Sequence, residues 1–383
     1  MSQVVDVAII GGGIVGCAIA ERLIQETDLS VWLFEKQALA AGTTGRSVGV
    51  FGIQHPTELD IRLRQESFEV YQELVSDPEV SVEYVRTGYL HISTSETEAV
   101  EIRRTVDRVN RLGGTARCLS AEQAAEIVPG LYVDDLQEVG YAPEDGYFDG
   151  SELTNAFAHR AVRAGVKLNI GVAVQDIVVR GNRVRKLITE AGPVETEVVI
   201  NATGPWGRQM GEMVGLELPI CGVPGQILVV RPQKRFSRVM PMVFNRDTHA
   251  YFRGEGTDRL LLGWLDKRYR EDGGINPDRL PNRPFPEFRE RAIAETVHRL
   301  PAMESAALVG GWVGAREVTP DRYPILGESS VRRFFCAIGF SGHGIQLAPA
   351  AARIVSEAIQ GKGSVPKMLS IDRFEREGVY RYE

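Results

Sequence analysis

The string GGGIVG at residues 11–16 constrains the fold of this chain more than any other segment of the sequence. It follows a short apolar run, residues 4–10, which we predict to be a buried parallel strand, and it opens a helical pattern. Glu35 lies 19 residues after Gly16, at the end of a second predicted strand, residues 30–34. A strand, a glycine turn, a helix and an acidic residue in this order predict a dinucleotide-binding βαβ unit.

Each part of this unit has a physical role in binding a dinucleotide. Gly11 permits the tight turn, Gly13 lets the backbone approach a pyrophosphate, and Gly16 allows the helix to pack closely on the strand. Ile14 and Val15 begin the helix, whose N-terminus attracts the phosphate charge. The acidic residue is expected to accept hydrogen bonds from the adenosine ribose hydroxyls. A glycine-rich turn without a ligand remains the alternative at this point.

Length and composition exclude several classes of protein. The 383 residues are too many for one small domain and suit two compact lobes. A net charge of −7 argues against nucleic acid as a partner. The longest apolar run, residues 7–20, is too short to span a bilayer, and the first residues lack the basic start of a signal peptide. The four cysteines form no CxxC pair and the six histidines do not cluster, so we expect a cytoplasmic protein without a metal site.

Periodicity and turn residues predict further elements along the chain. Thr57 is expected to cap a helix that runs to about residue 76, with Asp60 as its capping-box partner. Residues 181–182, Gly-Asn, predict a hairpin, and alternating apolar residues between 218 and 262 predict an antiparallel sheet. Other helices are predicted over residues 148–164, 286–300 and 344–359.

Several motifs far from the N-terminus resemble one family. They are ATGPW at 202–206, TPD at 319–321, PILG at 324–327 and GFSGHG at 339–344. Together with the N-terminal glycines they resemble the D-amino-acid oxidase superfamily of FAD enzymes. The nearest branch is that of the sarcosine oxidase β-subunit, dye-linked proline dehydrogenase, glycine oxidase and D-amino-acid dehydrogenase. The resemblance runs from about residue 5 to about residue 359.

This resemblance implies an α/β fold with two lobes. A glutathione-reductase-type FAD-binding lobe is expected from residues 1–86, 146–216 and 311–383. A substrate lobe with a mixed antiparallel sheet is expected from residues 87–145 and 217–310.

The resemblance also implies which residues contact the FAD. Val174 would bond the adenine through its backbone, and Gly204 would lie near the pyrophosphate. The amides of residues 342–346 would face the flavin N1–C2=O edge, where a helix N-terminus stabilises the charge that reduction creates. His343 is interpreted as a backbone spacer without a proton-transfer role. The complete implied set is Lys36, Thr43, Thr44, Gly45, Arg46, Ser47, Val174, Gly204, Gly314, Gly342, His343, Gly344, Ile345 and Gln346.

Three residues are candidates for the substrate side. Arg316 follows Trp-Val-Gly-Ala in a segment that gives related enzymes a carboxylate-binding arginine. The planar guanidinium of an arginine can donate two parallel hydrogen bonds to one carboxylate. A structural ion pair is the alternative for this residue. Tyr251 falls where relatives place a hydroxyl on the same carboxylate, although a core tyrosine is nearly as good an interpretation. His55 is assigned either to the pocket or to the surface, and Arg253 is the next candidate if Arg316 is structural.

Departures from relatives refine the expected cofactor chemistry. Some relatives attach the flavin to a cysteine near the position of Gly314, and the sarcosine oxidase β-subunit attaches FMN to a histidine that is missing here. We therefore predict non-covalent FAD and no second flavin. The lysine that activates oxygen in several relatives maps near Leu261, which favours a dehydrogenase. The acceptor would then be a dye, a quinone or a partner protein, with O2 as the alternative.

The predicted reaction is oxidation of an amino acid or N-alkyl amino acid by hydride transfer to flavin N5, followed by hydrolysis of the imine. A 2-hydroxy acid or glycerol phosphate is an alternative substrate. A flavoprotein subunit or assembly factor with mainly structural FAD is an alternative of another class. A nicotinamide-dependent dehydrogenase fits the C-terminal motifs poorly. The sequence leaves open a homo-oligomer or a second subunit.

Overall fold

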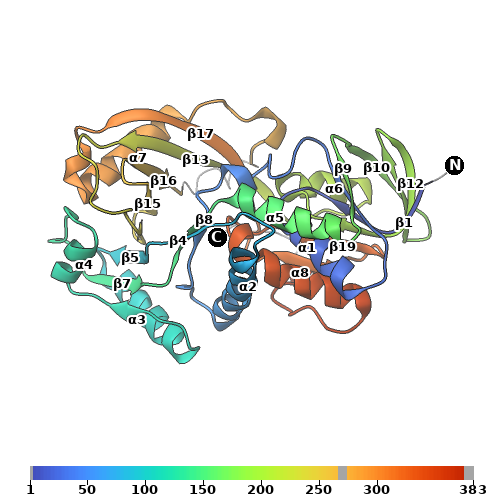
Figure 1. The fold of residues 1–383 in the computed structure, drawn as a ribbon, viewed down its shortest axis with the longest axis horizontal. Coiled ribbons are helices and arrows are strands. Elements are labelled where there is room, and N and C mark those ends of the chain that lie inside the picture. The colour runs from blue at the N-terminus through green and yellow to red at the C-terminus, as the bar shows by residue number, and fades with distance from the viewer. Residues whose placement is uncertain (1–2, 266–273, 375–383) are drawn as a thin grey trace.

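A computed structural model describes residues 3–265 and 274–374 of the chain. Two large sheets form the framework of the molecule, and each sheet is covered by helices (Figure 1). Residues 1–2, 266–273 and 375–383, which belong to the predicted lobes, lie outside the described residues. The predicted α/β class with a mixed second sheet is confirmed.

The described α-helices have these bounds: α1 Ile14–Glu26, α2 Glu58–Ser76, α3 Glu96–Arg111, α4 Ala121–Ile127, α5 Gly150–Arg163, α6 Gly207–Met213, α7 Pro286–Arg299 and α8 Gly344–Gln360. The first ten strands are β1 Gln3–Ile10, β2 Val31–Glu35, β3 Val50–Phe51, β4 Tyr84–Arg86, β5 Tyr89–Ser93, β6 Arg117–Cys118, β7 Glu138–Ala142, β8 Gly146–Phe148, β9 Lys167–Ile170 and β10 Val174–Val179. The remaining described strands are β11 Val184–Thr189, β12 Gly192–Asn201, β13 Cys221–Arg231, β14 Met242–Asn245, β15 Ala250–Glu255, β16 Arg259–Trp264, β17 Ala307–Val318, β18 Ile325–Glu328 and β19 Phe334–Ile338.

The first sheet brings distant segments of the chain to one edge. Its strands run in the order β10-β11-β12-β1-β2-β9, with β19 paired to β12 and β18 to β19. β1 is parallel to both β2 and β12, so Ile10 lies opposite Phe34 on one side and Asn201 on the other. The residues that follow these three positions therefore meet at the carboxyl edge, which is where open α/β sheets bind ligands.

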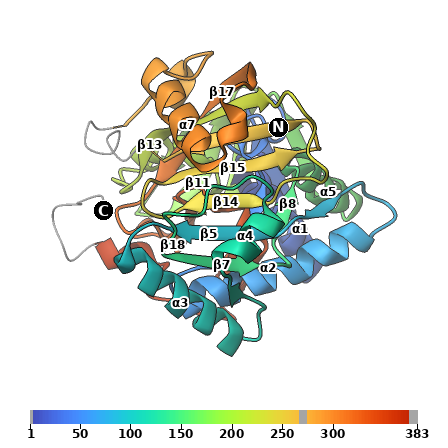
Figure 2. The same cartoon turned by 90° about the vertical axis from the view of Figure 1, so that its left-hand side faces the viewer.

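The second sheet is mostly antiparallel and has the order β17-β13-β16-β15-β14-β5-β7-β6. α7 and α4 pack over it through apolar residues such as Phe288 and Ala124 (Figure 2). Its longest pair joins β13 and β17, from Cys221 opposite Val318 to Arg231 opposite Ala307. A small sheet, β3-β8-β4, completes the framework.

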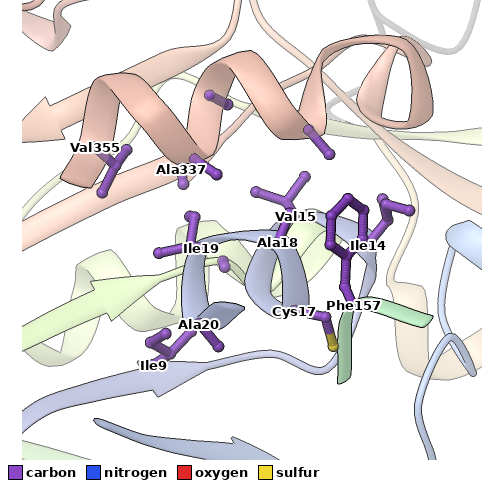
Figure 3. Close-up of a cluster of buried hydrophobic side chains, with 14 of the residues drawn as sticks. Ile9, Ile14, Val15, Cys17, Ala18, Ile19, Ala20, Phe157, Ala337 and Val355 are labelled. Carbon is purple, nitrogen blue, oxygen red and sulfur yellow. The ribbon is translucent and has the colours of Figure 1, made fainter. Parts of the chain in front are cut away.

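The core of the first lobe shows why the chain folds in this way locally. Val7 and Ile9 of β1 point to α1, and Ala8 packs on the opposite face, as expected for a strand covered on both sides. The first two turns of α1, residues 14–21, are buried all round, and the helix contacts α8 through Val15 and Val355 (Figure 3).

Several local predictions are confirmed by the described residues. The Thr57 side chain accepts a hydrogen bond from the Asp60 amide at the start of α2, and β10 and β11 form the predicted hairpin. All four cysteines are free thiols. Within the part of the chain that the structure describes, no helix is long and apolar enough to cross a membrane.

Candidate active site

A cavity of about 770 Å³ lies at the carboxyl edge of the first sheet and extends under the second sheet. Its walls come from the turn after β1, the loop between β2 and α2, the start of β10, the segment around Gly204, strands β14 and β17, and the start of α8. The motifs that are scattered in the sequence therefore line one continuous space.

The turn after β1 forms the dinucleotide end of this cavity. Gly11 has φ +113°, and a Cβ atom there would lie 2.4 Å from the Ala202 carbonyl oxygen, so only glycine fits. Gly13 lines the cavity, and an added Cβ there would meet only the Thr44 hydroxyl, at 3.3 Å. The same hydroxyl accepts a hydrogen bond from the Ile14 amide at 3.3 Å. This geometry leaves the start of α1 accessible to an anionic group.

Glu35, predicted to hold the adenosine ribose, and Lys36, predicted for the flavin and pyrophosphate side, lie next along the cavity wall. The Glu35 carboxylate accepts hydrogen bonds of 2.8 Å from the amides of Gly12 and Gln37, which fixes its orientation. The Lys36 ammonium lies 2.8 Å from Asp278 and 4.1 Å from the centre of the Trp206 ring.

Two more predicted cofactor residues also line this end of the cavity. Val174 begins β10, and Gly204 adopts φ +56° beside the carboxylate of Glu317. Burial raises the pKa of Glu317 to about 7, although hydrogen bonds from the amides of Glu317 and Phe340 act in the opposite direction. A carboxyl group near the predicted pyrophosphate is therefore partly protonated at neutral pH.

The start of α8 presents backbone amides to the cavity. All residues from 342 to 346 line it, and His343 occupies the N-cap position without a side-chain capping bond. The first amides of a helix have no partner inside the helix and are free to bind a ligand. Farther along, Pro349 has no N–H for the Ile345 carbonyl, and the buried Tyr71 hydroxyl donates a hydrogen bond to that carbonyl instead.

A buried arginine beneath this helix was not predicted from the sequence. Arg64 has no exposed surface, and its guanidinium donates to the Gln346 side chain at 2.9 Å and to the Asp60 carboxylate at 2.7 Å. The signal was available, because Asp60, Arg64, Ser67 and Tyr71 lie on one helical face at spacings of three and four residues. This polar stripe holds the start of α8 against α2.

Arg316 and Tyr251 come together at the substrate end of the cavity. Arg316 lies on β17, and its buried Nε has no hydrogen-bond partner among the described residues. A Cβ atom at Gly342 would lie 3.2 Å from its terminal nitrogen, which places the guanidinium beside the start of α8. Burial raises the pKa of Tyr251, and the positive charge of Arg316 acts against that rise. The two side chains can therefore act on one anionic group.

His55 and His343 form a pair that the sequence did not reveal. Their rings are perpendicular with centroids 5.0 Å apart, and both line the cavity. Burial, followed by the charge of Arg64, lowers the pKa of His343 to about 3. The same two causes lower the pKa of His55 well below its ordinary value. Both imidazoles are therefore neutral near pH 7.

Some residues of the predicted glycine turn and of the implied cofactor set do not line the cavity. Thr43, Thr44 and Ser47 do line it, whereas Gly16, Gly45, Arg46 and Gly314 do not. Arg46 instead donates hydrogen bonds to the carbonyls of Ala41 and Gly42, because the turn places its guanidinium against its own backbone. Gly314 packs on Arg46, since a Cβ there would lie 3.1 Å from the Cβ of that arginine. These glycines serve close packing of the wall.

Arg253 lies off the cavity, contrary to its place as the next carboxylate candidate. Its guanidinium donates to the Val48 carbonyl and to the Glu255 carboxylate, each at 2.7 Å. It lines a second cavity of about 280 Å³ together with Leu261. That cavity shares Thr44, Ser47 and Val48 with the main one.

Further side chains at the substrate end were not predicted. They come from β5, α3, β14 and the turns after β14 and β17, and they are Tyr89, His91, Glu98, Phe244, Arg246, His249 and Arg322. Burial lowers the pKa of His91 to about 3, and Arg246 forms a 2.6 Å ion pair with Glu98. Alternation along a predicted strand identifies the residues that share one face of the sheet. It does not identify which of the two faces lines the cavity.

The residues present fit FAD. The glycine turn has room for a pyrophosphate, Glu35 is oriented at the end of β2, and two helix starts face the same cavity. The amides of α8 would lie at the flavin, and the start of α1 would lie at the pyrophosphate. The described residues contain no group of three or more His, Cys, Asp or Glu side chains arranged for a metal ion.

Comparisons with known proteins identify the family of this chain. Glycine oxidase from Geobacillus kaustophilus (strain HTA426) is 28% identical over 94% of this chain and 94% of its own. Mitochondrial sarcosine dehydrogenase from Mus musculus is 26% identical over 89% of this chain, which spans only 38% of that relative. The crystal structure of L-proline dehydrogenase from P. horikoshii has a TM-score of 0.89 at 28% identity, covering 98% of this chain and 99% of that one. The family described as FAD dependent oxidoreductase (DAO) matches residues 6–358, and the chain therefore belongs to the DAO family, with FAD as its cofactor.

Proposed function

We propose that this FAD-dependent oxidoreductase oxidises a free amino acid or an N-alkyl amino acid. Bound FAD supplies the acceptor for hydride from the α-carbon of the neutral amine, and water hydrolyses the resulting imine. Relatives named for glycine, sarcosine and proline support this class of substrate.

The observation that carries the proposal is the buried side chain of Arg316 beside Tyr251. Its Nε has no hydrogen-bond partner among the described residues. A buried arginine nitrogen without a protein partner is costly, and a planar carboxylate satisfies it at two points. The Tyr251 hydroxyl lines the same space and adds a neutral donor. The pair would fix the carboxylate of a substrate and so orient its α-carbon.

The neutral histidines support a reaction that needs no strong base. His55 and His343 are uncharged near pH 7, so neither adds a positive charge that would repel an incoming ammonium group. Their contribution would be shape and neutral hydrogen bonding. Arg316 and Tyr251, which we call the carboxylate clamp, would orient the substrate, and the start of α8 would stabilise the negative charge on the reduced flavin. These two effects would supply most of the catalysis.

We assign the acceptor to a dye, a quinone or a partner protein in preference to O2. Leu261, the apolar residue near the mapped lysine position, cannot stabilise superoxide, but it lines the second cavity and not the main one, so the assignment rests on the sequence mapping. Turnover with and without an indophenol dye in air measures this, and equal rates would reject the assignment. The absence of a cysteine at Gly314 supports non-covalent FAD, which acid precipitation should release completely into the supernatant.

An anaerobic screen of amino acids for flavin bleaching tests the proposed function. The holoprotein is mixed with free amino acids, N-methyl amino acids and 2-hydroxy acids, and the flavin absorbance is followed. Bleaching by amino acids supports the proposal. Bleaching by 2-hydroxy acids alone would move the function to that class, and a flavin that no substrate reduces would indicate a structural cofactor.

A further inference from the structure

Arg322 stands out among the residues at the substrate end because its backbone is strained. It lies in the turn after β17 and has φ +67°, a conformation that costs a side-chain-bearing residue free energy and costs glycine almost nothing. Six described residues other than glycine have positive φ, and three of them, His249, Arg322 and Ser341, line the main cavity. Strain of this kind is concentrated at functional sites.

The guanidinium of Arg322 has no partner among residues 3–265 and 274–374. No hydrogen bond or ion pair joins its side chain to any of them. The neighbouring Asp321 is bound to Arg373 at 2.6 and 3.1 Å, and Glu98 is bound to Arg246 at 2.6 Å. Asp321 and Glu98 are therefore already paired with other arginines.

The charges around Arg322 are of its own sign. Burial lowers its pKa first, and the positive charge of Arg246 lowers it further. Arg322 in turn acts on the pKa values of Arg316 and His343, so it lies within electrostatic reach of the carboxylate clamp. Arg322 is exposed where it lines the cavity, so water solvates its guanidinium until a ligand displaces that water. An anionic ligand then stabilises a cation that lies near another cation and has no carboxylate partner among the described residues.

We propose that Arg322 forms a second anion subsite and that the substrate is an amino acid with a second carboxylate, either a dicarboxylic amino acid or an N-carboxyalkyl amino acid. The proposal rests on the proposed function, in which Arg316 holds the α-carboxylate. Arg322 would then bind the distal carboxylate across the cavity.

The charge and shape of the subsite favour a carboxylate. Arg246 is largely neutralised by Glu98, so Arg322 supplies about one free positive charge, which matches one carboxylate. A neutral group that displaced the water there would leave the guanidinium without an anionic partner. Such unpaired groups produce strong discrimination between otherwise similar substrates.

The experiment compares substrates that differ only in the distal charge. The holoprotein is titrated with glutarate and with its monoamide, neither of which has an α-amine, and the shift of the flavin spectrum gives each Kd. Glutamate is then compared with glutamine, and N-(carboxymethyl)glycine with its monoamide, by anaerobic bleaching, using both enantiomers of the chiral pair. The diacid is expected to bind or react about 10-fold to 100-fold better, as for a charge-assisted pair.

Variants of Arg322 separate the subsite from structure. Arg322→Gln should bring the diacid-to-monoamide ratio to about 1, and Arg322→Lys should keep part of the preference. Arg322→Gly should lose the preference while Tm stays the same or rises, because glycine relieves the strained φ. Arg333→Gln is the matched control, since Arg333 has φ +66° but lies outside the cavity, and it should keep the full preference.

Two outcomes would reject the second anion subsite while leaving the proposed function intact. The first is an equal or better response to the monoamide than to the diacid in the unmodified protein. The second is a preference for the diacid that survives in Arg322→Gln and Arg322→Gly. A flavin that no amino acid of any kind bleaches would instead reject the proposed function itself.

Discussion

The two ends of the cavity are built by different means. At the dinucleotide end the ligand-facing groups are mainly backbone amides and glycines, placed by the parallel register of β1, β2 and β12. At the substrate end they are side chains from separate strands and turns, among them Tyr251, Arg316 and Arg322. The first end depends on close packing of the backbone, whereas the second depends on the identity of a few polar side chains.

This difference implies different responses to mutation. A change that adds a single methyl group at the dinucleotide end should abolish cofactor binding, because backbone atoms cannot move aside. A change at the substrate end should leave the cofactor in place and alter the rate or the choice of substrate.

The largest effect is expected from Gly11→Ala. The new Cβ would lie 2.4 Å from the Ala202 carbonyl oxygen, and the flavin absorbance of the purified protein should fall almost to zero. Gly165→Ala is the matched control, because Gly165 has φ +114° but no atom within 4 Å of an added Cβ. It should keep the FAD and lose only about 1–2 kcal/mol of stability from the strained backbone. Equal loss of FAD in both variants would show that packing is not the cause.

The next largest effect is expected from Arg316→Ala at the other end. Loss of a desolvated bidentate partner should lower kcat/KM for a free amino acid by roughly 10²-fold or more, with normal FAD content. Arg316→Lys should also be impaired, because it lacks the planar fork. Amino-acid amides should be much less sensitive than the free acids. If acids and amides lose activity equally, the carboxylate is held elsewhere, and Arg246 becomes the next candidate.

The dinucleotide end could be predicted from sequence because its geometry is local. The string at residues 11–16 fixes a turn, a helix start and a close approach, and Glu35 follows at the end of the next strand. The meeting of residues 10, 34 and 201 at one edge then follows from parallel pairing of buried strands.

The substrate end could be predicted only in part. Arg316 and Tyr251 were found through motif context, and the structure brings them together. The pairing of His55 with His343 depends on how α2 packs on α8, which no local pattern encodes. Arg322 lies between two recognised motifs, TPD and PILG, but its left-handed backbone and its unpaired guanidinium become visible only in three dimensions.

A smaller loss of stability is expected from a change at Tyr71, which holds the start of α8, a helix that lines both ends of the cavity. Tyr71→Phe removes the donor to the Ile345 carbonyl, which Pro349 leaves without a helical partner. An unsatisfied buried carbonyl costs about 1–3 kcal/mol, so the midpoint of urea unfolding should fall. Tyr84→Phe is the control, because its hydroxyl donates to the Glu144 carbonyl at an exposed site and water can replace it. Equal destabilisation in both variants would contradict this account of the start of α8.

The smallest effect is expected from Glu317, and it depends on pH. Burial raises the pKa of this carboxyl to about 7 from an ordinary value of 4.5, so the folded state keeps the proton at pH values where the unfolded state has lost it. The associated stability is complete below pH 4.5 and is lost as the pH rises through 7. Above pH 7 the carboxylate lies beside Gly204, close to where the pyrophosphate is predicted, and repels it.

The affinity of the apoprotein for FAD should therefore fall by up to about 10-fold for a rise of one pH unit above 7, since one unit of pKa corresponds to one decade in binding. Glu317→Gln cannot ionise, so its Kd for FAD should change little between pH 6 and 8, and it should bind more tightly than the unmodified protein at pH 8. Exposed Glu304→Gln should follow the unmodified protein. Fluorescence quenching of added FAD measures all three. A pH dependence that persists in Glu317→Gln would assign the titrating group elsewhere.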